Sequence, residues 1–132
     1  MDHRRLSARV DEALRDFESI PEEYDINAIY GPERPVFVNM RDLEWEVLRE
    51  LKEMHEEWAG GIELLPTSAY GVRLYRNHSS LVMHHDKIHS HVISSIVHIT
   101  HKYDDDNVPW PIQIEDHHGR LHGKRSFLPT VL

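Results

Sequence analysis

The sequence predicts an α+β fold, with two helices packed on the outside of a β sandwich or barrel. Two observations support this prediction. Up to Pro66, apolar residues recur at the three-to-four-residue spacing of helices. Beyond it, apolar and polar residues alternate in short segments separated by turn residues, as in antiparallel strands. A length of 132 residues fits a single domain.

The two expected helices lie on either side of a connection. Pro21 ends the first, over residues 2–19, whose apolar stripe consists of Leu6, Val10, Ala13, Leu14 and Phe17. Residues 20–40 are rich in proline and glycine and are predicted to contain no regular element. The second helix begins near Asp42, stops at Gly60-Gly61 and has the stripe Leu43, Val47, Leu48, Leu51, Met54 and Trp58.

Five segments beyond Pro66 are expected to form strands. They are residues 69–76, 80–86, 91–101 and 110–115, followed by a return strand that starts at 120–122. Turns are expected at residues 77–79 and 116–119, and a polar loop at residues 104–107. The interpretation is therefore a helical region over residues 1–66 and a β region over residues 67–132.

Charge and composition exclude several functions. Lys plus Arg number 15 and Asp plus Glu 23, so the net charge of −8 argues against a nucleic-acid partner. The chain has no cysteine, which excludes disulfides and thiolate metal sites. No apolar stretch approaches the length of a membrane span, and the N-terminus is charged. We therefore expect a soluble, cytoplasmic protein without a membrane partner. Histidine is unusually frequent, with 12 residues.

The motif His84-His85-Asp86 suggests a metal site. On a strand, residues i and i+2 share a face, so His84 and Asp86 would project together. With a second histidine they would form the two-histidine, one-carboxylate set that binds Fe(II) in non-haem oxygenases. In a chain this rich in histidine the triplet has little weight by itself, and a polar strand end explains it equally well.

Several further motifs occur in order around this triplet. They are Arg73-Leu74-Tyr75, His91-Val92-Ile93-Ser94, Pro109-Trp110-Pro111 and Glu115-Asp116-x-x-Gly119. Together with His84-x-Asp86 this series resembles the prolyl 4-hydroxylase-like branch of the 2-oxoglutarate- and Fe(II)-dependent dioxygenases, over residues 69–122. The resemblance implies a partial double-stranded β-helix of the jelly-roll or cupin type, supported by the N-terminal helices.

The resemblance also implies functional residues. His84 and Asp86 match the first two iron ligands, and His122, in His122-Gly123-Lys124, is a candidate for the third. Tyr75 matches a tyrosine whose hydroxyl contacts 2-oxoglutarate, although an ordinary barrel aromatic remains an alternative. Ser94 lies where the family lines its pocket. The implied cofactors are Fe(II) and 2-oxoglutarate, with ascorbate as a reductant, and the implied substrate is peptidyl proline or a related residue of a peptide or protein.

The sequence departs from the family at three places. Residue 78 is histidine where the family has glycine, so His78 is expected to adopt a positive φ. His122 lies only 36 residues after Asp86, closer than the family's distal histidine. No Lys or Arg stands about ten residues beyond His122, where the family binds the distal carboxylate of 2-oxoglutarate. We interpret the chain as an incomplete dioxygenase domain.

Two other functions remain open. One alternative is a catalytically inactive fragment that acts as an interaction or oligomerisation module. The other is a small cupin-like, histidine-rich protein that binds Zn²⁺ or Ni²⁺. His98 and His101 would face opposite sides of a strand, so they are not expected to bind one metal together.

Overall fold

The computed structural model describes residues 3–25, 27–87, 89–101, 112–124 and 130–131. The chain divides into two compact units, Met1–Ile93 and Ser94–Leu132. The expected boundary between residues 66 and 67 lies inside the first unit, so residues 67–93 belong to the same unit as the helices.

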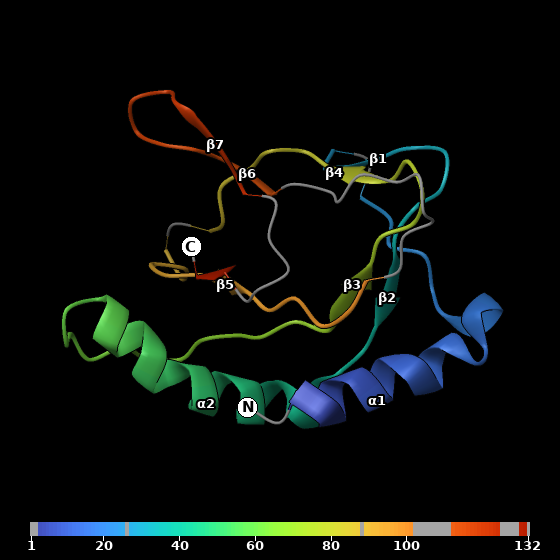
Figure 1. Ribbon diagram of the computed structural model, residues 1–132, viewed down its shortest axis with the longest axis horizontal. Helices are drawn as coiled ribbons and strands as arrows, with labels where there is room; N and C mark the ends of the chain where they lie inside the picture. Colours follow the sequence, from blue (N-terminus) through green and yellow to red (C-terminus); the bar gives the residue numbers. More distant parts are fainter. Residues whose placement is uncertain (1–2, 26, 88, 102–111, 125–129, 132) are drawn as a thin grey trace. The chain divides into compact units, whose positions relative to one another are not determined.

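Both predicted helices are present in the first unit (Figure 1). Helix α1 spans His3–Leu14 and buries Leu6 and Val10. It ends before the predicted residue 19, because the chain tightens into i−3 hydrogen bonds and continues as the 3₁₀ turn η1, Phe17–Ser19. Helix α2 spans Arg41–Trp58, as the apolar stripe predicts.

The two helices run in opposite directions where they meet. Arg5 of α1 pairs with Glu46 of α2, and Arg9 pairs with Asp42, so the pairing positions ascend in one helix and descend in the other. The predicted stripe of α2 is buried at its start and exposed at its end: Leu43 is 5% exposed, whereas Met54 is 38% and Trp58 60% exposed.

A Schellman motif ends α2. The amide of Gly61 donates to the carbonyl of Glu56, and the amide of Gly60 to that of Glu57. Both glycines have positive φ, which explains why a Gly-Gly pair stops the helix here.

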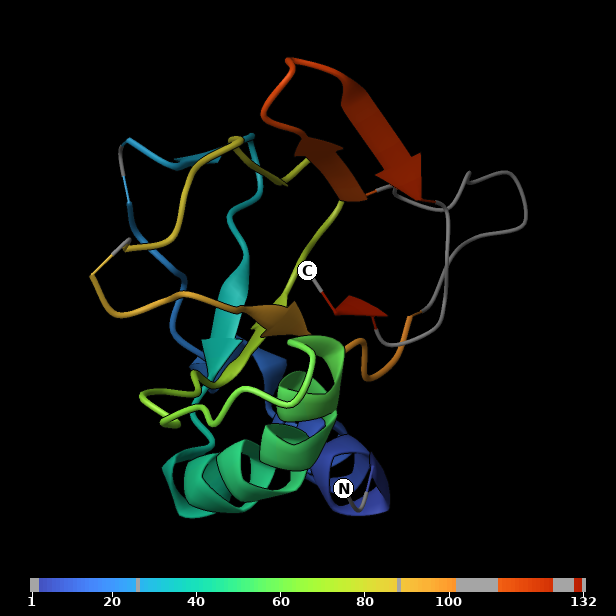
Figure 2. The same cartoon turned by 90° about the vertical axis from the view of Figure 1, so that its left-hand side faces the viewer.

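Two short antiparallel strand pairs complete the first unit. Strand β2, Val36–Val38, pairs with β3, Val72–Leu74, and Figure 2 shows them side by side above the helices. Strand β1, Ile29–Tyr30, pairs with β4, Ser80–Leu81. The core lies between the helices and these strands and consists of Leu6, Val10, Ile29, Val36, Val38, Met40 and Leu43.

These pairs correct two sequence predictions. The segment 20–40 is not a bare connection, since it contains β1 and β2. Its strands are two and three residues long, and their pairing partners lie far along the chain, so no local pattern reveals them. The strand predicted over 80–86 ends at Leu81, because its partner β1 is only two residues long.

The turn between β3 and β4 agrees with the sequence. His78 has a φ of 61°, and no other non-glycine residue of the described part of the chain has a positive φ. The hydroxyl of Ser79 donates to the carbonyl of Arg76 and accepts from its amide, which closes the turn.

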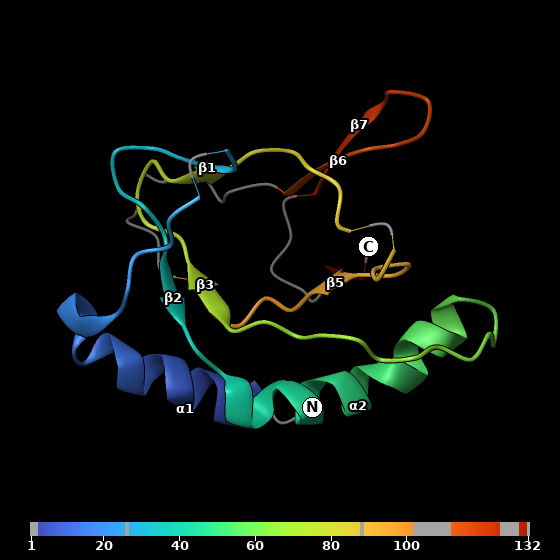
Figure 3. The ribbon, with the colours of Figure 1, turned by 180° about the vertical axis from the view of Figure 1, so that it is seen from behind.

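The second unit contains a hairpin and a short strand pair. Strand β6, Ile112–Glu115, pairs with β7, Leu121–Lys124, around the predicted turn, and Figure 3 shows this hairpin from behind. Strand β5, Ser95–Ile96, pairs with β8, Thr130–Val131. The prediction of one strand over residues 91–101 is therefore wrong except at its centre, where Ser95 and Ile96 form β5. Residues 110–111 and the loop at 104–107 lie outside the described residues.

The described strands form four separate two-stranded sheets and no closed barrel. Within the same residues, neither α1 nor α2 combines the length and apolar character needed to cross a membrane.

Candidate functional site

His84 and Asp86 lie together in the loop that follows β4. The Nε2 atom of His84 is 3.9 Å from Oδ1 of Asp86, and the side chains are 48% and 46% exposed. No strand extends over these residues, so loop geometry rather than strand parity brings them together. The sequence predicts that these two side chains lie near each other, and the structure brings them together through a loop instead of a strand.

A backbone hydrogen bond selects the tautomer of His84. Its Nδ1 lies 2.8 Å from the carbonyl oxygen of Val82. A carbonyl only accepts, so Nδ1 carries the proton, and in the neutral ring Nε2 then has the lone pair. Metal-binding histidines are commonly oriented by such a bond from the nitrogen that does not bind the metal.

The separation of the pair is wider than a shared cation requires. A distance of 3.9 Å is too long for a hydrogen bond. Two ligands that bind one cation at about 2.0–2.2 Å each, at octahedral or tetrahedral angles, lie about 3.0–3.4 Å apart. Nε2 of His84 and Oδ1 of Asp86 would therefore move closer by about 0.5–0.9 Å to contact one cation.

Both ends of this loop are fixed to the first unit. At its start, the amide of Val82 donates to the carbonyl of Ala28, which extends the pairing of β1 with β4. At its end, the amides of Ser90 and His91 both donate to the carbonyl of Lys87. The loop that contains His84 and Asp86 thus has anchored ends.

A second set of contacts holds the end of the loop against residues 67–70. The hydroxyl of Thr67 donates to the carbonyl of Ser90, and the hydroxyl of Ser68 lies 3.3 Å from Nε2 of His91. The rings of Tyr70 and His91 stack with centroids 6.4 Å apart. His91 therefore has a structural role in holding the loop.

Tyr75 follows β3 and belongs to a charged network. Nη1 of Arg73 donates to the hydroxyl of Tyr75 at 3.4 Å, and the guanidinium also lies over the ring. Glu23 accepts from two other nitrogens of Arg73. The hydrogen bonds that Arg73 donates to Glu23, and secondarily its contact with Tyr75, raise the pKa of Arg73, although burial acts in the opposite direction.

His122, the candidate third ligand, has a carboxylate partner in the β6–β7 hairpin. Its Nε2 lies 3.0 Å from Oδ2 of Asp116. The other oxygen of Asp116 accepts from the amides of His118 and Arg120. The bond from His122, followed by the amide of Arg120, lowers the pKa of Asp116. Sequence reasoning missed this pair, because His122 lies opposite Ile114 in the register of the hairpin and not opposite Asp116.

The candidate ligands divide between the two units. His84, Asp86 and Tyr75 belong to the first, whereas Ser94 and His122 belong to the second. Ser94 precedes β5 and is half-buried. Among the described residues, no three histidine, aspartate or glutamate side chains gather closely enough to hold a metal ion. The structure therefore brings together two of the three proposed iron ligands.

His98 and His101 differ from their expected arrangement. Their ring centroids lie 5.2 Å apart, with the planes tilted by 34°. The expectation that they face opposite sides required a strand over 91–101, but β5 ends at Ile96. The expected alternation of side chains between two faces does not apply to His98 and His101, because the backbone beyond Ile96 is irregular.

No family model, no curated protein and no solved structure matches the chain.

Proposed function

We propose that the chain is an Fe(II)- and 2-oxoglutarate-dependent oxygenase that hydroxylates peptidyl proline or a related residue. The observation that supports this proposal is the pairing of His84 and Asp86, with the proton of His84 held on Nδ1 by Val82. Imidazole nitrogen and carboxylate oxygen are suitable ligands for Fe(II) in such enzymes. The order of motifs from Tyr75 to His122 supports the same assignment.

Each residue has a distinct role in this proposal. Nε2 of His84 and a carboxylate oxygen of Asp86 bind the metal. By its local motif His122 would be the third ligand, and its Nε2 lies 3.0 Å from Oδ2 of Asp116 within the hairpin. Tyr75, with Arg73 beside its hydroxyl, offers a donor and a positive charge to a carboxylate of 2-oxoglutarate. When bound, Fe(II) and 2-oxoglutarate would use O₂ to convert a C–H group of the substrate into an alcohol, with 2-oxoglutarate converted into succinate and CO₂.

The test measures succinate formed from 2-oxoglutarate by the full chain, with Fe(II), ascorbate, O₂ and a proline-rich peptide. We expect Fe(II)-dependent turnover that falls at least about 100-fold in His84→Ala, because the loss of a ligand removes the metal. His85→Ala is the matched control, since His85 is an exposed neighbour of the same type, and it is expected to retain turnover. Absence of succinate with wild-type protein, or equal turnover in His84→Ala, would refute the proposal.

An interaction module is the second candidate function. Large apolar side chains are exposed in the first unit, and Leu65 and Val92 are each 86% exposed. Exposed apolar surface of this kind is typical of contact surfaces. Sedimentation of the full chain separates the two candidates: a concentration-dependent oligomer that neither binds Fe(II) nor forms succinate supports the module. Metal binding without turnover supports the histidine-rich metal-binding protein instead.

A further inference from the structure

We propose that His98 and His101 form a two-imidazole binding site for a divalent transition metal, Zn²⁺ in the first instance. This site lies in the unit Ser94–Leu132 and does not depend on the proposed oxygenase site, which needs His84 and Asp86. The observation that supports it is the approach of the two rings in the segment after β5.

The separation of the rings matches a shared metal. Zinc binds imidazole nitrogen at about 2.0–2.1 Å in tetrahedral geometry, which places the centres of two bound rings about 5 Å apart. The observed centroid distance is 5.2 Å. Flat stacking would need nearly parallel planes, whereas the planes of His98 and His101 are tilted by 34°. The centres of the two rings therefore have the spacing that a shared cation requires.

The chemistry of the residues favours metals of borderline softness. Neutral imidazole suits Zn²⁺, Ni²⁺ and Cu²⁺, whereas Ca²⁺ and Mg²⁺ prefer oxygen ligands. His101 is exposed and His98 is half-buried, so a metal reaches both from solvent and keeps water in its remaining positions.

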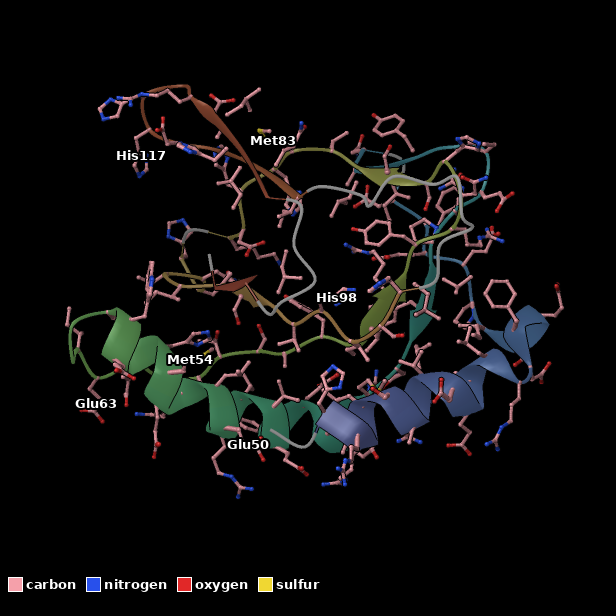
Figure 4. The ribbon with its side chains drawn as sticks, in the orientation of Figure 1. Glu50, Met54, Glu63, Met83, His98 and His117 are labelled. Carbon is pink, nitrogen blue, oxygen red and sulfur yellow. The ribbon has the colours of Figure 1, made fainter. Side chains whose placement is uncertain are left out.

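The local backbone explains why this pair can act together. Strand β5 ends at Ile96, and the residues from Val97 to His101 form no regular element. A strand would direct residues i and i+3 to opposite faces, but the irregular path brings both rings to one side. Figure 4 labels His98 on this segment and His117 at the tip of the β6–β7 hairpin.

The test is a titration of the full chain with Zn²⁺, followed through the imidazole signals in NMR spectra. We expect the signals of His98 and His101 to shift together, and the affinity to fall at least about tenfold in His101→Ala. His101 is exposed, so this variant is expected to fold normally. His98→Ala should produce the same loss, and His117→Ala, in the exposed turn, is the matched control that should bind as the wild type does.

Repeating the titration in His84→Ala separates this site from the proposed iron site. We expect the signals of His98 and His101 to respond as in the wild type, whether or not the chain turns over 2-oxoglutarate. Ring signals that Zn²⁺ leaves unmoved, or wild-type affinity in both His98→Ala and His101→Ala, would overturn the proposal. An equal loss in His117→Ala would overturn it as well, since binding would then be unspecific among the histidines.

Discussion

At the scale of single residues, the donor pair of the candidate site depends on a main-chain atom. The carbonyl of Val82 fixes the proton of His84 on Nδ1, so the orientation of the ring is set within two residues of its own position. Asp86 follows two residues later, and the three positions form a self-contained local unit. Sequence reasoning reached this pair because its members are close in the chain. It could not place His122 relative to them, since that residue belongs to the other unit.

The positive φ of His78 leads to a prediction about stability. This conformation destabilises a residue with a side chain by about 1–2 kcal/mol, whereas glycine adopts it without strain. We expect His78→Gly to stabilise the first unit by about 0.5–1 kcal/mol, because the relief of strain exceeds the added freedom of the unfolded chain. Urea denaturation of the two proteins measures the difference, and a loss of stability would contradict the prediction.

Gly31 lies against the carbonyl of His78, and a substitution there should have the opposite effect on stability. It has a φ of 121°, and a Cβ atom there would lie 2.1 Å from the carbonyl oxygen of His78. Gly31→Ala should therefore destabilise the unit, whereas Gly123→Ala should not do so by a clash, since nothing lies within 4 Å of that position.

At the scale of elements, a carboxylate ties the end of α2 to the segment that follows. Glu56 accepts a hydrogen bond from Lys52 one turn earlier and another from the amide of Leu64 at 2.8 Å. These two hydrogen bonds, with the one from Lys52 the larger cause, lower the pKa of Glu56 below its ordinary value of 4.5. The ionised carboxylate therefore holds the chain as it leaves the Schellman motif.

The hydrogen bond from the amide of Leu64 to Glu56 should depend on pH in a defined direction. A lowered pKa in the folded state means that the stabilising contribution is complete above the unfolded pKa and is lost as the pH falls through the folded pKa. We expect the amide proton signal of Leu64 to titrate with a midpoint below 4.5 in NMR spectra. Glu56→Gln should abolish that titration, and Glu57→Gln, its exposed neighbour, should preserve it. A midpoint at or above the ordinary value would contradict this account.

At the scale of the whole molecule, local and long-range structure differ in how well the sequence predicts them. Helix α2 was predicted because its stripe and its Gly-Gly stop are local signals. The β6–β7 hairpin was predicted for the same reason, since only the five residues 116–120 separate the strands. Strands β1 and β2 were missed because their partners lie some 35–50 residues away, as in the register of Val36 with Leu74. Their lengths depend on those partners and not on local alternation.

The core of the first unit, rather than its ion pairs, should determine its stability. Val10 is fully buried (0% exposed), and removing its two methyl groups is expected to cost about 2 kcal/mol. The bridge from Arg9 to Asp42 joins the same two helices, but both side chains are partly exposed, and such pairs contribute about 0.2–1 kcal/mol. Val10→Ala should therefore lower the free energy of unfolding, measured in urea, by more than Arg9→Ala does. High salt should weaken only the contribution of Arg9. An equal or larger effect of Arg9→Ala would show that the helices are held mainly by charge.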